Sequence, residues 1–470
     1  MNHTADRPRF FGTSLLYFGG TLFSKLAVFL LLPLYTAKIP AGELGDMDAA
    51  IALAVFAASV LLLDVGVAIL RFYLQANEKE QGRVLATGLC LMGALALQYL
   101  LFALVLRLFF NVRYFWLIVL YGLSNVLLLA VGHMARALGA RIRYVLSGLL
   151  AALLQVSLAP VLVLLLDRGV QGLYIAYIVG ALCGVLTVLL SPTLWRALRG
   201  ARPSGRLLRQ MLGFALPLGA SAAAYLLLSS LLRVVARVHF GSEAAGHLAV
   251  ALKLSQIILL VSTCFQLVWQ ELAFAVEATE DTAYYSARVD VFLRVATAAF
   301  SVLLPLTALL FALFPRFLGT EYAAAAGLLP PALLFAFFTV IATFLEPILA
   351  GCGQTGRLLL TTLAGSLVNV LLTVSVLLLG GGLYWLPLVG AFSFLTVALL
   401  RILLLTRAGV LRLSVRHALL LIPVLAVMGA YYLLSVPLQA AVLGLALLFA
   451  MAILLPEILL LFGRLFFGHT

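Results

Sequence analysis

The chain has 470 residues, of which 65% are hydrophobic and only 10% are charged. A soluble domain of this length carries about 25% charged residues, so the composition excludes a soluble globular protein and predicts a polytopic membrane protein. The formal net charge is +13, yet no polar module is left that could form a basic face for nucleic acid. The four cysteines are too widely separated to predict a disulfide framework or a metal site.

Two long apolar runs open the chain, at 11–35 and 49–73. Each is longer than the roughly 20 residues that a helix needs to cross a bilayer, and the segment 39–46 between them is predicted to be a loop. Each run carries one charge that hydrocarbon does not tolerate, Lys25 in the first and Asp64 in the second. Both side chains are therefore expected to face partners or a water-filled cavity.

Further apolar runs follow in chain order. They lie at 84–110, 114–138, 144–166, 172–194, 211–240, 244–276, 287–314, 324–350, 358–379, 384–405, 417–434 and 438–462. The pattern predicts an all-α membrane protein of about 14 transmembrane helices. The domains expected are an N-terminal six-helix lobe (1–198), a basic cytoplasmic linker (199–210), a C-terminal six-helix lobe (211–408) and two additional helices (409–470).

Basic residues are distributed unevenly between the two sides of the membrane. With a cytoplasmic N-terminus, the outer loops hold only Lys38, Arg113, Arg168 and Arg316. The cytoplasmic segments hold many more, including five arginines between positions 195 and 210. Because cytoplasmic loops carry the excess of lysine and arginine, both termini are predicted to be cytoplasmic.

An internal repeat appears in two loops about half a chain apart. Glu43-Leu44-Gly45 follows the first predicted helix, and the segment 242–246, SEAAG, follows the first helix of the second half. With six helices in each half, both halves enter from the same side and would be related by an axis along the membrane normal. Such a pair of lobes encloses a cleft.

Polar residues inside the predicted spans indicate what would line this cleft. Lys253, Gln256, Gln266 and Gln270 fall on one helical stripe, and Tyr17 lies two four-residue steps before Lys25. The predicted lumen cations are Lys25, Arg233, Lys253 and Arg294, and the predicted sugar-facing residues are Tyr17, Gln256, Gln266 and Gln270. A cationic, glutamine-rich cleft suits a large anionic, hydroxyl-rich substrate and suits a cationic drug poorly.

Other polar residues have a simpler interpretation. Glu346 and Arg401 lie towards the ends of their predicted helices, where long charged side chains reach the membrane interface, and snorkelling is the expectation for both. Single polar residues such as His133 and Asn369 are expected to act in interhelical packing.

Several short motifs carry a family resemblance. They are LPLYT at 32–36, LRFY at 70–73, GFALP at 213–217, LAGCGQTGR at 349–357 and SLVN at 366–369. With these motifs the chain resembles the polysaccharide-biosynthesis flippases of the multidrug/oligosaccharidyl-lipid/polysaccharide exporter superfamily. The resemblance implies two six-helix lobes in a V around a central cavity, two extra C-terminal helices and a location in the bacterial inner membrane.

The resemblance also implies a function. The substrate would be an undecaprenyl-pyrophosphate-linked oligosaccharide, moved from the cytoplasmic to the outer leaflet for O-antigen, capsule or exopolysaccharide assembly. Expected partners are this substrate, membrane lipids, and a polysaccharide polymerase with other assembly proteins. Neither enzymatic activity nor a cofactor is expected.

No glycine-rich phosphate loop with a lysine is present, so an ion gradient or the membrane potential is expected to supply the energy. Asp64 and Glu346 are the candidates for coupling to H⁺ or Na⁺. Two alternatives stay open. A drug/cation antiporter of the same superfamily would have a lumen dominated by carboxylates, and a membrane-integral glycosyltransferase or polymerase would place its catalytic residues on a sizeable outer loop.

The predicted topology has a direct test. Cysteines introduced at Ser204 and Thr355 should be protected from impermeant thiol reagents in intact cells, whereas a cysteine introduced at Ser242 should react, because only Ser242 lies in a predicted outer loop. Labelling of Ser204→Cys from outside would contradict a cytoplasmic N-terminus.

Overall fold

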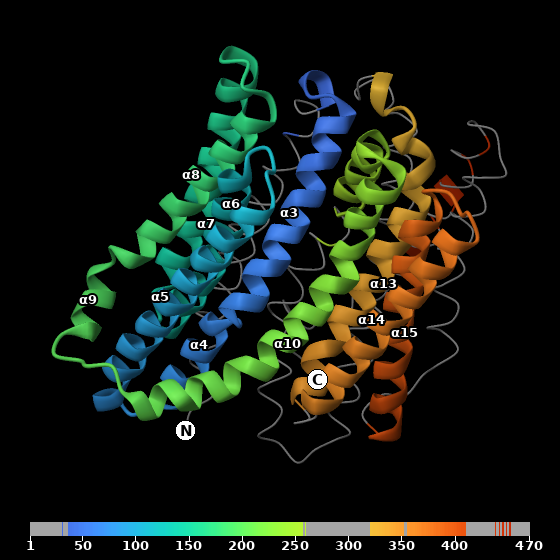
Figure 1. Ribbon diagram of the computed structural model, residues 1–470. Helices are drawn as coiled ribbons and strands as arrows, with labels where there is room; N and C mark the ends of the chain where they lie inside the picture. The colour runs from blue at the N-terminus through green and yellow to red at the C-terminus, as the bar shows by residue number, and fades with distance from the viewer. Residues whose placement is uncertain are drawn as a thin grey trace. The chain divides into compact units, whose positions relative to one another are not determined.

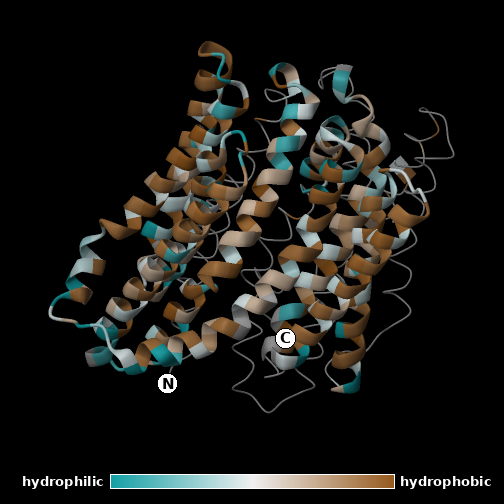
Figure 2. Cartoon of the chain, viewed as in Figure 1, coloured by the Kyte–Doolittle hydropathy of each residue, from teal (hydrophilic) through white to brown (hydrophobic). Residues whose placement is uncertain are grey.

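The computed structural model describes residues 31, 36–256, 259, 320–351 and 355–409, with a few single residues between 438 and 452 (Figure 1). Its contacts divide the chain into two compact units, Met1–Ala249 and Val250–Thr470. In the described ranges, every regular element is helical. Most of the helix length there is apolar (Figure 2). The boundary predicted at 199–210 between two lobes remains a prediction.

Nine helical spans within the described ranges are long and apolar enough to cross a membrane. The prediction of an all-α polytopic membrane protein is therefore confirmed. The runs predicted at 11–35, 287–314 and 417–434 lie outside the described residues.

The first unit contains most of the described elements. They are α3 (Ala41–Leu62), α4 (Val65–Gln75), α5 (Glu78–Phe109), α6 (Phe115–Ala137), α7 (Arg141–Pro160), the π-helix η1 (Val161–Leu165), α8 (Gly169–Leu189), α9 (Pro192–Leu198), α10 (Gly205–Val235) and the π-helix η2 (Ala236–Phe240). Helix α8 packs against α6 and α7, and α10 packs against α3, α4 and α5.

The predicted span 49–73 differs from the structure at two points. Helix α3 begins at Ala41, so the segment 39–46 is not simply a loop and its acidic residues lie on the first turns of a helix. The span is also broken at Leu63 and Asp64, whose φ angles of 52° and 51° are left-handed. Left-handed backbone is rare for residues other than glycine and cannot continue a right-handed helix, so Asp64 lies at a break between α3 and α4 rather than in the middle of a straight helix. Such conformations concentrate at functional or switching sites.

Neighbouring helices approach this break closely. A Cβ on Gly219 of α10 would lie 2.9 Å from the Cα of Leu63, and a Cβ on Gly66 would lie 2.6 Å from the Cα of Ala130 on α6. Small residues allow such contacts between membrane helices. The broken segment is thus clamped between α6 and α10.

The second unit contains the short 3₁₀ helix η5 (Thr320–Tyr322) and the helices α13 (Ala325–Gly351), α14 (Thr355–Leu378) and α15 (Trp385–Arg407). Helix α15 packs against both α13 and α14. The side chain of Tyr322 is fully buried just before α13, and burial, together with the charge of Glu321, raises the pKa of its phenol.

Arg401 of α15 joins the three long helices of the second unit. Its guanidinium donates hydrogen bonds to the carbonyl oxygen of Ala342 on α13 and, over 3.3 Å and 3.0 Å, to the hydroxyl oxygens of Thr361 and Thr362 on α14. Its Nη1 lies 3.6 Å from a carboxylate oxygen of Glu346 on α13. The side chain is only 2% exposed, so the expectation that Arg401 snorkels to the interface is wrong. The hydrogen bonds and the neighbouring carboxylate offset the free-energy cost of burying the Arg401 guanidinium.

The pairing of Glu346 with Arg401 predicts a specific stability effect. Glu346→Gln leaves a buried guanidinium without its counter-charge and should lower the free energy of unfolding by about 3 kcal/mol, while the double variant Glu346→Gln/Arg401→Met should regain most of that loss. Thermal unfolding in detergent measures both, with the exposed Arg407→Gln as the control. Equal losses in the single and double variants would show that the pair is not coupled.

Candidate functional site

The first two turns of α3 carry the acidic residues Glu43, Asp46 and Asp48. Their spacing of three and two residues spreads them around the helix, because successive residues are turned by about 100°. Each acid meets an arginine from a different part of the first unit. In the first turn of α3, a carboxylate oxygen of Glu43 lies 4.0 Å from Nη1 of Arg113, which follows α5.

The other two acids bind α3 to α10 and its continuation. Asp46 forms an ion pair with Nε of Arg237 on η2, and an Oδ2 to Nε distance of 3.4 Å separates Asp48 from Arg233 on α10. The two pairs differ in burial. The side chains of Asp46 and Arg237 are 50% and 42% exposed, whereas those of Asp48 and Arg233 are 10% and 20% exposed.

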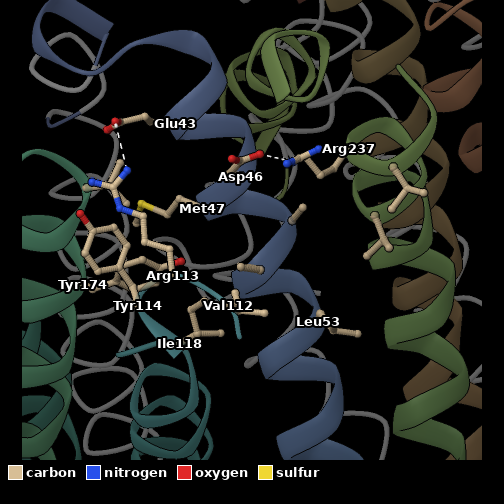
Figure 3. A pocket seen from close by; sticks show the side chains of 15 residues that line it. Glu43, Asp46, Met47, Leu53, Val112, Arg113, Tyr114, Ile118, Tyr174 and Arg237 are labelled. Atoms are coloured by element: carbon tan, nitrogen blue, oxygen red, sulfur yellow. Dashed lines mark ion pairs between the residues drawn. The ribbon is translucent and has the colours of Figure 1, made fainter. Parts of the chain in front are cut away.

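A pocket of about 560 Å³ opens beside these pairs (Figure 3). Its lining comes from α3, the segment 112–114, α6, α8, α10 and η2, and comprises Glu43, Asp46, Met47, Ala49, Ala50, Leu53, Val112, Arg113, Tyr114, Ile118, Val170, Tyr174, Val234, Arg237 and Val238. Two ion pairs stand at its polar side, and the rest of the wall is formed mainly by aliphatic side chains together with Met47 and the rings of Tyr114 and Tyr174 (Figure 3). An apolar cavity with a few convergent polar groups is the usual form of a small-molecule site.

Three tyrosines lie near the buried Asp48–Arg233 pair. The ring of Tyr121 on α6 meets the rings of Tyr174 and Tyr177 on α8 edge to face, at centroid distances of 6.2 Å and 5.7 Å. Tyr121 also interacts electrostatically with Asp48 and Arg233. The Nε of Arg233 is the nitrogen that faces Oδ2 of Asp48, and it makes no hydrogen bond among the described atoms, so the two groups are held by charge rather than by a hydrogen bond of good geometry.

The two segments identified as repeats pack directly on one another. A Cβ on Gly45 would overlap the carbonyl oxygen of Ser242, and a Cβ on Gly246 would overlap the carbonyl oxygen of Ala41. Only glycine allows backbones to approach this closely. The beginning of α3 is therefore held against the segment 242–246 by backbone contact, and against α10 and η2 by ion pairs.

The structure places some of the predicted site residues. Arg233 pairs with Asp48, Asp64 lies at the break between α3 and α4, and Glu346 pairs with Arg401. Lys253 is partly exposed and Gln256 is exposed, in the second unit. The remaining candidates, Tyr17, Lys25, Gln266, Gln270 and Arg294, lie outside the described residues. The roles of all these residues remain predictions.

Sequence reasoning missed the part of the site that α3 contributes. It placed Asp46 and Asp48 in an outer loop and drew no connection between them and Arg233 or Arg237. The sequence did contain one signal, a pair of acids and a pair of arginines at the ends of two apolar runs. Asp46 and Asp48 stand directly before one run, and Arg233 and Arg237 stand near the end of another. The pairing itself joins positions about 185 residues apart and needs the tertiary structure.

No protein-family model and no curated protein matches the sequence. Solved structures do match the fold. A lipid II flippase, MurJ, in an inward closed conformation aligns with a TM-score of 0.69 and 12% identity, over 95% of this chain and 99% of that chain. A multidrug resistance MATE family transporter of the MOP superfamily, in an inward-facing conformation, aligns with a TM-score of 0.58 and 17% identity, over 84% and 95%.

These matches define the class of protein. The chain has the fold of the MOP-superfamily transporters and flippases, as the resemblance in its sequence motifs predicted. Within that class, the alignment with the lipid II flippase includes nearly the whole of both chains. The prediction of an all-α multi-pass membrane fold is confirmed.

The burial difference between the ion pairs predicts different coupling energies. In a double-mutant cycle of Asp48→Asn and Arg233→Gln, the loss in the double variant should be smaller than the sum of the single losses by about 1–3 kcal/mol, because removing one partner leaves the other charge buried. A cycle of Glu43→Gln and Arg113→Gln is the matched control. Its exposed pair should show a coupling below about 1 kcal/mol in unfolding measurements. If the losses in the free energy of unfolding at Asp48 and Arg233 were additive, the two charges would not be coupled.

Proposed function

We propose that this protein is a flippase that moves an undecaprenyl-pyrophosphate-linked oligosaccharide from the cytoplasmic to the outer leaflet of the bacterial inner membrane. The observation that carries the proposal is the alignment of a lipid II flippase with 95% of this chain at a TM-score of 0.69. The motif resemblance to polysaccharide-biosynthesis flippases supports the oligosaccharide class, and both termini would be cytoplasmic.

The proposed mechanism is alternating access. In one state the cleft is open to the cytoplasm, and contacts at the beginning of α3 keep the outer end closed. The Gly45 and Gly246 contacts and the ion pairs of Asp46 and Asp48 are suited to this role, since they fasten α3 to η2, α10 and the segment 242–246. The half-exposed Asp46 pair contributes about 1 kcal/mol or less, and the more buried Asp48 pair contributes more. Binding of a large substrate would have to offset both losses when the outer end opens.

Substrate recognition would fall to the predicted lumen residues. Lys25, Arg233, Lys253 and Arg294 would bind the pyrophosphate, and Tyr17, Gln256, Gln266 and Gln270 would bind sugar hydroxyls. Arg233 faces Asp48 in the structure, so a phosphate bound by its guanidinium would compete with that carboxylate. The prenyl chain would remain in lipid. Asp64 at the α3–α4 break, or Glu346, would couple the cycle to H⁺ or Na⁺.

The second candidate function is a drug/cation antiporter, which the alignments with multidrug MATE transporters favour. Such a transporter would need carboxylates that are available to a cation. In the described pocket, Glu43 and Asp46 each face an arginine, which opposes a cation-binding role there. The MATE alignment cited above also covers less of this chain, 84%, than the flippase alignment does.

Lys253 provides the decisive test of the proposed substrate. Lys253→Gln should insert and fold normally but fail to restore polysaccharide export in a strain that lacks the protein, because one charge-assisted contact to a phosphate contributes about 1.5–3 kcal/mol and its loss weakens binding at least about tenfold. Lys253→Arg should retain export.

The control is Lys38→Gln, which removes an exposed lysine from the first unit and should leave export unchanged. Normal export by Lys253→Gln, or a loss of protein level in proportion to export, would refute the phosphate role. Efflux of a cationic dye that survives Lys253→Gln would favour the antiporter.

A further inference from the structure

A row of arginines follows α8 and is called the arginine belt here. It consists of Arg196 on α9, Arg199 and Arg202 in the connecting segment, and Arg206 and Arg209 at the beginning of α10. All five side chains are exposed. The sequence contains no aspartate or glutamate between Arg168 and Ser242. The belt is therefore an uninterrupted concentration of positive charge.

The belt differs from the arginines at the opposite end of the first unit. There, Arg113, Arg233 and Arg237 each face an acid of α3. By contrast, no ion pair connects a belt arginine to an acid within the described ranges. Arg196 donates a 3.3 Å hydrogen bond to the carbonyl oxygen of Pro192, which leaves most of its guanidinium donors outward.

The belt is held in place by α5. A Cβ on Gly82 of α5 would lie 2.6 Å from the carbonyl oxygen of Ala197, so the backbones of α5 and α9 are in close contact. The backbone N–H of Ser204 donates a 3.0 Å hydrogen bond to the hydroxyl oxygen of Thr87 on α5. Leu194, on α9 itself, is buried. The arginines thus project from an anchored segment, which can be followed from α9 to α10 in Figure 1.

Trp195 indicates where this segment lies relative to a bilayer. Its side chain is 62% exposed, and its indole N–H donates a 2.8 Å hydrogen bond to the carbonyl oxygen of Leu189 at the end of α8. An exposed tryptophan at the end of a membrane helix is typical of the headgroup region. The neighbouring arginines therefore stand at the height of lipid phosphates.

We propose that the arginine belt binds anionic phospholipid headgroups of the surrounding leaflet. Guanidinium groups form paired hydrogen bonds with phosphate oxygens, and several arginines in a row favour lipids that carry a net negative charge. Each arginine near an anionic surface raises lipid affinity about fivefold. The positive-inside rule explains only which side of the membrane the arginines occupy. The anchored backbone fixes their positions, and without acidic partners among the described residues their guanidinium groups can bind lipid phosphates.

Trp195 serves as the reporter for this proposal. The protein is reconstituted in phosphatidylcholine vesicles that contain either brominated phosphatidylglycerol or brominated phosphatidylcholine at the same mole fraction. The quenching due to Trp195 is the difference between the parent and Trp195→Phe. It should be several-fold stronger with the brominated anionic lipid, and Arg199→Gln/Arg202→Gln should lower the relative association constant for that lipid by at least about tenfold.

The matched control is Lys38→Gln/Arg168→Gln, which removes the same net charge from exposed residues outside the belt. It should retain the full preference for the anionic lipid. Equal quenching by the two brominated lipids would overturn the proposal, and so would an equal loss of preference in the control variant.

Discussion

Hydrocarbon cannot solvate a charge, and this constraint organises the part of the chain that the structure describes. Arg401 satisfies it with a carboxylate, a backbone carbonyl and two threonine hydroxyls from two other helices. Asp48 and Arg233 satisfy it by facing one another. In each case a polar group that would be costly alone becomes a connection between helices, so the same residues determine which helices pack together.

Close backbone contact supplements these connections. The beginning of α3 meets the segment 242–246 through Gly45 and Gly246, and the break at Leu63 is met by Gly219. Because apolar burial provides little net attraction between helices in lipid, such van der Waals contacts carry much of the packing energy. Contacts of this kind are either made or lost, which would suit the alternating-access cycle proposed above.

The first unit has two differently charged ends, and the difference has functional meaning. At one end, arginines are neutralised by the acids of α3 and contribute to packing around a pocket. At the other end, the arginine belt stands outward on an anchored segment. Paired charges hold helices together, whereas unpaired charges at the interface are available to lipid phosphates. The flippase function proposed above would use both, because it would close one side of a cleft while the protein remains embedded among charged lipids.

Hydropathy and charge bias are local properties, so the sequence alone determined the all-α membrane class, most of the spans and the uneven distribution of arginines. It also located the two repeated segments near residues 43 and 242. Only the tertiary structure decided that α3 begins at Ala41, that Asp48 and Asp46 pair with arginines 185 and 191 residues further along the chain, and that Arg401 is buried rather than snorkelling. The reason is physical: whether a charge faces lipid, water or a partner depends on which distant helix lies beside it.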